Sequence, residues 1–171
     1  HRNILKFERT QFATIEDHDD FIVYSINSVV KETDELFVLG DVGNLDNLKR
    51  IKCRLYLLTG NHDTQTVKKY RAYFAEVYEF PFYFKGNILL SHIPVPVTKE
   101  ILNVHGHLHG SRLDSQNYFN LSANMINYTP VSEEQLYQMA AKLPKQTIRF
   151  LEEWYADLYV FDRPQERNDV I

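Results

Sequence analysis

The sequence predicts an α/β or α+β sandwich, because short apolar runs alternate with segments of helical periodicity along most of its length. Its 171 residues suit one domain. Hydrophobic residues make up 44% and charged residues 25%, and these ordinary values exclude wholesale disorder. Several apolar runs end in a glycine followed by a polar side chain, as expected where strands of an α/β sheet present groups to a site.

The first half of the chain contains the clearest helix and two strands. We expect a helix over Ile15–Val30 with Thr14 as its N-cap, because its apolar residues recur at helical spacing. Glu35–Leu39 and Leu55–Thr59 are predicted to be buried strands. Thr64 is a plausible cap for a later helix. Two helices are indicated by spaced apolar residues, namely Leu45, Leu48 and Ile51 in the first, and Val67, Tyr70 and Phe74 in the second.

The second half begins with a predicted hairpin. Glu76–Phe84 is rich in aromatic and β-forming residues, and the turn residues 85–87 separate it from a strand at Ile88–Leu90. Two further strands are predicted at Ile101–Val104 and Tyr118–Leu121. One sheet face of the hairpin should carry alternating aromatic residues that pack in the core, with base stacking as the weaker alternative: Tyr78, Phe80, Phe82 and Phe84.

Helices are predicted at the C-terminal end. Ser132 opens one helix, with Gln135 three residues later in a capping-box pattern, and Pro144 ends it. Thr147–Tyr159 is predicted to be a further helix. We therefore divide the chain into a domain over 1–141 and a helical extension over 142–171. The extension would pack on the same domain, or join a second copy as a homodimer through the tail helix.

Charge and cysteine content narrow the class of protein. The net charge of −4 argues against nucleic-acid backbone as the main partner, because domains with that role usually carry a basic excess. Cys53 is the single cysteine, which favours a reducing, cytoplasmic location and a packed thiol. The longest apolar runs, such as Leu36–Leu39 and Leu55–Leu58, are too short to cross a membrane. We therefore expect no membrane partner.

Metal-type ligands follow the predicted strands. Asp41, Asn61 and His92 each come at a strand end, and the pair His107 and His109 follows another. Carboxylate, amide and imidazole groups can hold two divalent ions that clamp a phosphoryl group and activate a bridging water. Small glycines that let the loops converge precede three of these positions, namely Gly40, Gly60 and Gly106.

His62 suits a different role. It directly follows Asn61, so its imidazole can reach a leaving-group oxygen and protonate it. Asp63 could hold that imidazole and favour its charged form. His105, just before the His107 loop, is interpreted as a strand-end packing residue, with a supporting role behind the ligands as the alternative. His18 lies among acidic residues of the first helix and is expected to be solvated.

The motifs resemble, in order, those of the calcineurin-like metallophosphoesterases of small bacterial and phage type. They are Gly40-Asp41-Val42-Gly43, Gly60-Asn61-His62-Asp63, Ser91-His92 and Gly106-His107-Leu108-His109. The resemblance covers residues 1 to about 140. It implies a four-layer sandwich of two mixed β-sheets flanked by helices, with a dinuclear centre at the strand ends.

The resemblance also implies roles for these residues. Asp41 would bridge two divalent ions, which could be Mn, Fe, Zn or Ni. Asn61, His92 and His107 would hold one ion, and His109 would help to hold the other. His62 would act on the leaving group with Asp63 as its partner.

Members of that family also carry an Asp-x-His motif on the first strand, which supplies further ligands. No strand of this sequence carries one, and Asp17-His18-Asp19 lies on the first predicted helix. His1–Phe7 resembles the segment just after that motif, so we expect the first strand and its ligands upstream of His1. His1 and Asn3 are then candidates for the substrate pocket.

Three functions remain open from the sequence. The first is a metallophosphoesterase that hydrolyses phosphate mono- or diesters, such as a nucleotide, with a metal-activated hydroxide. The second is a catalytically impaired binding or scaffold module of the same fold. The third is a nuclease acting on short single-stranded nucleic acid, which the acidic charge balance disfavours only for tight duplex binding.

Overall fold

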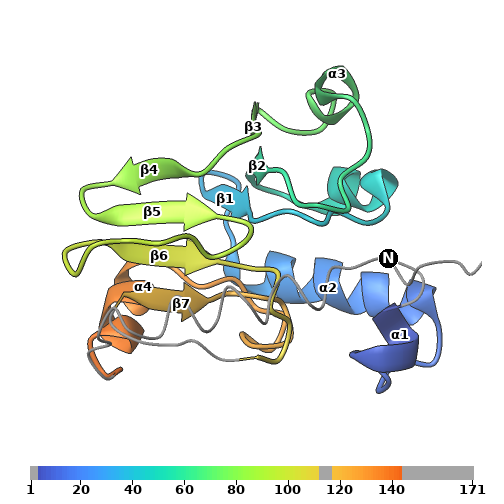
Figure 1. The fold of residues 1–171 in the computed structure, drawn as a ribbon. Coiled ribbons are helices and arrows are strands. Elements are labelled where there is room, and N and C mark those ends of the chain that lie inside the picture. The colour runs from blue at the N-terminus through green and yellow to red at the C-terminus, as the bar shows by residue number, and fades with distance from the viewer. Residues whose placement is uncertain (1–3, 112–116, 144–171) are drawn as a thin grey trace, which may run out of the picture.

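A computed structural model describes residues 4–111 and 117–143, which form an α/β fold built on two sheets (Figure 1). The first sheet is parallel and contains β1 (Glu35–Val38), β2 (Arg54–Leu58) and β3 (Glu76–Tyr78) in that order. The second is mixed and has the order β4-β5-β6-β7, in which only the β4–β5 pair is antiparallel. Its strands are β4 (Phe82–Lys85), β5 (Ile88–Ser91), β6 (Leu102–His105) and β7 (Tyr118–Asn120).

Helices of very different length surround the sheets. Helix α2 confirms the predicted first helix, and the Thr14 side chain accepts a 3.0 Å hydrogen bond from the Asp17 amide as its N-cap. The capping box of Ser132 and Gln135 at α4 is also confirmed. None of the helices in the described part of the chain has the length and apolar character needed to span a bilayer. The helices are α1 (Ile4–Phe7), α2 (Ile15–Val29), the 3₁₀ helix η1 (Leu45–Arg50), α3 (Val67–Tyr70) and α4 (Glu133–Ala140).

Two local expectations are wrong. The helix expected after Thr64 is the single turn α3, and Thr66 rather than Thr64 caps it by accepting from the Lys69 amide. The predicted strand Glu76–Phe84 is interrupted, and its two parts, β3 and β4, belong to different sheets. Pro81 has no amide hydrogen to donate to a ladder, so it suits this break.

The interruption also separates the aromatic residues that were expected on one face. Phe80 is 78% exposed, whereas Tyr78 and Phe82 stack with ring centroids 3.9 Å apart across the break. The β4–β5 hairpin itself is confirmed. The chain thus passes from one sheet to the other at a stacked aromatic pair, which joins the two halves of the core.

The buried side chains form two clusters, one on the first sheet and one that combines the second sheet with Leu58 of β2. Cys53 lies in the cluster of the first sheet, as expected of a packed thiol, and burial raises its pKa. Leu136 and Ala140 of α4 lie in the cluster of the second sheet, so α4 packs on that sheet. The main members of the first cluster are Leu55, Leu57, Tyr70, Phe74 and Val77, and those of the second are Ile88, Leu90, Leu102, Val104 and Phe119.

The expectation that His18 is solvated is wrong. Only 4% of this residue is exposed. Its imidazole makes edge-to-face contacts with the rings of Phe12 and Tyr128, at centroid distances of 5.1 and 6.2 Å. Acidic neighbours in the sequence suggested a surface position, but the loop that contains Tyr128 covers this part of α2.

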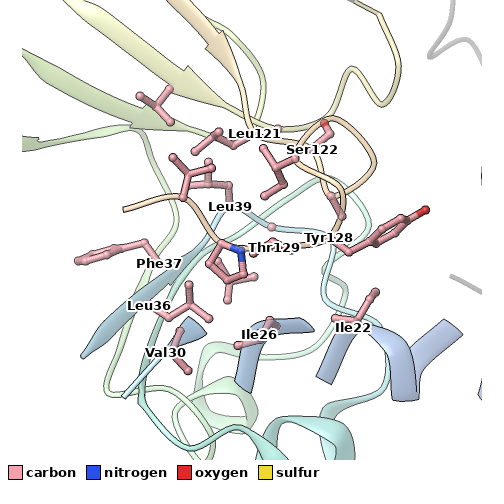
Figure 2. Close-up of a pocket in the computed structure, with 18 of the residues that line it drawn as sticks. Ile22, Ile26, Val30, Leu36, Phe37, Leu39, Leu121, Ser122, Tyr128 and Thr129 are labelled. Carbon is pink, nitrogen blue, oxygen red and sulfur yellow. The ribbon is translucent and has the colours of Figure 1, made fainter. Parts of the chain in front are cut away.

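An apolar cavity of about 1520 Å³ runs beside β1 (Figure 2). In the part of the chain that the structure describes, β1 pairs with β2 on one edge, and its other edge has no strand beside it. Ile22 and Ile26 of α2 line the cavity on one side, and Leu121 lines it on the other. His1, Asn3 and the tail over 144–171 lie outside the described residues, so the expectations for them, including a strand upstream of His1, stay predictions.

Candidate metal centre

Four of the predicted ligands come from loops that directly follow strands. Asp41 follows β1, Asn61 follows β2, His92 follows β5 and His107 follows β6. Ligand atoms of Asp41, His92 and His107 all lie within 4.8 Å of one another. Loops from both sheets therefore meet at one point.

The Asn61 side chain joins this group. Its Oδ1 atom lies 2.9 Å from Nε2 of His92 and 3.1 Å from Nδ1 of His107. Nε2 of His92 is in turn 3.2 Å from Nδ1 of His107 and 3.5 Å from Oδ2 of Asp41. The structure thus brings together the four residues that the sequence predicted for one ion.

A backbone carbonyl sets the tautomer of His92. Its Nδ1 atom lies 2.6 Å from the Leu39 carbonyl oxygen, which can only accept, so Nδ1 carries the hydrogen and donates it. In the neutral imidazole, Nε2 is then a lone pair that faces the lone pairs of Asn61 and Asp41. A hydrogen bond of this kind is the usual outer support of a metal-bound histidine. A divalent cation makes these converging lone pairs compatible, and Mn, Fe, Zn and Ni all accept such oxygen and imidazole donors.

Two glycines allow the Asp41 and Asn61 loops to touch. A Cβ atom on Gly40 would lie 2.5 Å from the Gly60 amide nitrogen and 2.6 Å from Nδ1 of His92. A Cβ atom on Gly60 would overlap the Asp41 carboxylate and lie 2.7 Å from Cε1 of His92. The sequence argument for a glycine before the ligand therefore holds at Gly40 and Gly60. It does not hold on steric grounds at Gly106, whose Cβ would meet nothing closer than 3.4 Å.

The ligand positions also carry backbone strain. Asp41 and His107 have φ values of 58° and 64°, in the left-handed region that side chains rarely adopt. His109 shares this conformation with a φ of 47°. Each such residue costs roughly 1–2 kcal/mol. Conformations of this cost cluster at functional sites, where surrounding contacts impose them.

The Asp63 carboxylate joins the two glycine loops. It accepts hydrogen bonds from the amides of Asp41, Val42 and Gly60 at 2.7–2.8 Å, and from the Tyr70 hydroxyl at 3.2 Å. A carboxylate has about four lone-pair positions, and four donors converge on this one. Asp63 thus has a structural role at the site that the sequence analysis did not anticipate, and its expected partnership with His62 stays a prediction.

His62 lies at the open side of the site. Its side chain is exposed and lines the large cavity together with Asp41 and His107. Its amide donates a 3.0 Å hydrogen bond to Oδ1 of Asp41, which leaves Oδ2 directed to His92. Because His62 is next to Asn61 and open to the cavity, its imidazole can contact a molecule that binds in the cavity beside the candidate ligands.

Two further histidines flank the group. His109 lines the same cavity, but it is not among the three described residues whose ligand atoms cluster, and its Nδ1 lies 3.8 Å from Oε1 of Glu8. His105 is fully buried and its Nδ1 bonds to the Gly106 carbonyl. Burial lowers the pKa of His105 from 6.5 to about 4. His105 is thus a neutral packing residue at the strand end, as the sequence favoured.

Arg9 was missed by the sequence analysis. It lines the cavity together with His62 and His109 and lies 2.6 Å from the ring of His18. Asp19 and Asn47 extend this contact into a hydrogen-bonded network. The only local signal for this network was His18, a histidine among the acidic residues at the start of α2. Its contact with Arg9 could not be predicted from the sequence, because the two residues meet only in the folded structure.

Comparisons with known proteins support the fold. No protein-family profile matches the chain. An uncharacterized protein of Methanocaldococcus jannaschii, MJ1445, is 26% identical over 162 residues, with coverage of 83% of this chain and 86% of that protein. The crystal structure of AQ665 from Aquifex aeolicus, a protein of unknown function, matches with a TM-score of 0.65 and 26% identity. That match covers 81% of this chain and 92% of AQ665. The chain therefore shares its fold with AQ665, and neither relative carries a named activity.

Proposed function

We propose that this protein is a metal-dependent phosphoesterase of the calcineurin-like type, which hydrolyses phosphate mono- or diesters. The observation that carries the proposal is the convergence of possible ligand atoms from Asp41, Asn61, His92 and His107. Nothing in this group is a nucleophile of the serine or cysteine kind, so metal-assisted hydrolysis is the chemistry that its donors favour. The motif order resembles that family, and the α/β architecture is compatible with it.

Bound divalent ions would supply Lewis acidity toward a phosphoryl oxygen and lower the pKa of a water molecule. Asp41, Asn61, His92 and His107 would hold that charge, and the Leu39 carbonyl keeps Nε2 of His92 available. His62 lies beside the ligands and opens to the cavity, so it donates a proton to the leaving oxygen of the ester.

A second ion is part of the proposal. Asp41 would be shared between the two ions, and His109 would contribute to the second. The remaining ligands would come from an additional strand beside β1. The outer edge of β1, which no described strand covers, and the apolar cavity next to it support that arrangement, because a strand placed there would end beside Asp41.

The substrate is proposed to be a small phosphate ester, a nucleotide or a short single-stranded nucleic acid. The loops around Asp41 and Asn61 are short, and the cavity beside them is wide. An open site of this kind accepts substituents of different size on the phosphorus. Hydrolysis of a chromogenic diester is therefore a suitable first assay.

The test uses Asp41→Ala and His107→Ala, each assayed on bis-p-nitrophenyl phosphate with Mn, Fe, Zn or Ni supplied. Removing either ligand should lower metal-stimulated turnover by at least about 1000-fold, because the charge that stabilises the transition state is lost. Asp46→Ala is the matched control, since its carboxylate is exposed and pairs with Lys49 on the surface of η1. Activity that survives both ligand variants would overturn the mechanism.

A binding or scaffold module of the same fold is the second candidate. The outer edge of β1 favours it, because an edge that residues 4–111 and 117–143 leave unpaired beside an apolar cavity also suits a partner strand. This candidate predicts bound metal without turnover under any of the four ions. Turnover that depends on Asp41 would exclude it.

A further inference from the structure

Arg9 occupies an unusual position for an arginine. It lies between α1 and α2, is only partly exposed, and places Cζ 5.5 Å from the centroid of the Tyr128 ring. Its Nη1 lies 2.6 Å from Nε2 of His18. An arginine fork offers several N–H donors, and this bond engages one of them.

His18 is built to receive that bond. Its Nδ1 lies 3.0 Å from Oδ1 of Asp19, so Nδ1–H donates to the carboxylate and Nε2 is free to accept from Arg9. The Asn47 side chain donates to the other Asp19 oxygen at 2.7 Å. Burial of His18 lowers its pKa, which keeps the imidazole neutral at neutral pH. A buried chain of hydrogen bonds from α2 and η1 thus holds the guanidinium in place.

Arg9 has no ion pair with a carboxylate among the described residues. Two cationic side chains of the described segments, Arg9 and Lys85, line the large cavity. Lys85 forms a 2.6 Å ion pair with Glu133. Glu8 and Asp19 lie near enough to interact with the charge of Arg9, but neither forms a direct ion pair with it, so its guanidinium N–H groups can still take up an anion.

We propose that Arg9 binds the phosphoryl oxygens of the substrate, and that His18 is its positioning residue. The proposal rests on the proposed phosphoesterase function and adds a recognition group to it. Asp41, His62 and His107 line the same cavity, so a phosphate ester bound at the metal centre shares one solvent space with Arg9. The planar fork of a guanidinium matches two phosphate oxygens at once, which a lysine cannot do.

The direct test is binding of inorganic phosphate to the metal-stripped chain, measured by calorimetry. Arg9→Ala should weaken this binding about 10- to 100-fold, the loss typical of charge-assisted hydrogen bonds. Arg9→Lys should recover part of the loss, since it keeps the charge without the fork. Arg71→Ala is the matched control, because Arg71 is exposed, pairs with Glu76 on the surface and does not line the cavity. Its phosphate affinity should equal that of the wild type.

The positioning role is tested by kinetics. His18→Asn should raise KM for bis-p-nitrophenyl phosphate about as much as Arg9→Ala does, while kcat changes little. Urea unfolding of each variant separates this effect from loss of the fold. Equal changes in kcat and KM, or an unchanged KM in a folded variant, would overturn the role of His18.

The outcomes separate this inference from the proposed function. If the protein shows metal-stimulated turnover, and Arg9→Ala changes neither the phosphate affinity nor KM, then the role of Arg9 is refuted. The proposed phosphoesterase function would stand. If phosphate binding depends on Arg9 but the protein shows no metal-stimulated turnover, then the phosphoesterase function is refuted. The anion site at Arg9 would stand.

Discussion

The two sides of the candidate metal centre differ in how closely their candidate ligand atoms approach one another. On one side, Asp41, Asn61, His92 and His107 converge within hydrogen-bonding distances. On the other side, His109 lies near Glu8 and faces the apolar cavity. We call these the convergent side and the open side.

Strand pairing accounts for part of the difference. Three of the four convergent ligands follow β2, β5 and β6, which each have a partner strand on both edges, so the loops after them have fixed origins. Asp41 follows β1, which among the described residues has a partner on one edge alone, and it is held instead by its contacts with Asp63, the His62 amide and His92. The open side borders this same edge of β1. The following experiments test this interpretation, beginning with the largest expected effect.

The sharpest contrast is between two histidines. His92→Ala should weaken binding of the tighter divalent ion at least about 100-fold, because loss of a ligand exceeds the loss of an outer hydrogen bond to one. His109→Ala should change the same affinity by less than about 10-fold, since His109 stands apart from the convergent side. Titration with Zn²⁺ or Mn²⁺ measures both. Equal losses in the two variants would show that the sides do not differ.

A second experiment uses pH to probe the convergent side. His105 has an ordinary pKa of 6.5 and a folded-state pKa of about 4, because burial disfavours its charged form. The unfolded chain therefore binds a proton at His105 between these values and the folded chain does not. This stabilisation is fully present above pH 6.5 and is lost as the pH falls toward 4.

The expected loss is about 3 kcal/mol, from 1.36 kcal/mol per pKa unit. Urea unfolding in the presence of a chelator, between pH 4 and pH 7, measures it. His105→Asn removes the titrating ring and should flatten the slope. An unchanged slope in that variant would assign the acid sensitivity to other groups, of which His18 on the open side is the first candidate, because burial lowers its pKa as well.

The smallest effect concerns the contact between the glycine loops. Gly60→Ala places a methyl group against the Asp41 carboxylate and His92, and should cost about 1–3 kcal/mol of unfolding free energy through overpacking. Gly106→Ala is the matched control at the next ligand loop, where the nearest atom is the Leu39 carbonyl oxygen at 3.4 Å. It should change stability by less than about 1 kcal/mol. Thermal unfolding compares the pair, and equal destabilisation would contradict the close contact between loops.

Local rules predicted much of the fold. Periodic apolar residues located α2, and the Ser132 capping box located the start of α4. The strand predictions were mostly right because apolar runs bounded by turn residues are a local signal. They failed where Pro81 divides one aromatic run between two sheets, since sheet membership depends on distant strands.

The candidate site shows the same division. The identities and order of Asp41, Asn61, His92 and His107 were readable as strand-end ligands before any coordinates. Their distances were not, because each comes from a different strand. Asp63 shows the limit clearly: its neighbour His62 suggested a catalytic pair, whereas its hydrogen bonds tie together backbone amides of two loops.

The sequence by itself thus determined which residues end the strands and what chemistry they carry, because these follow from residue type and short-range spacing. Only the tertiary structure decided which of them meet. The tertiary structure also buries His18 in contact with Arg9, and it forms the cavity beside β1. These features arise from packing between segments far apart in the chain, for which no local pattern exists.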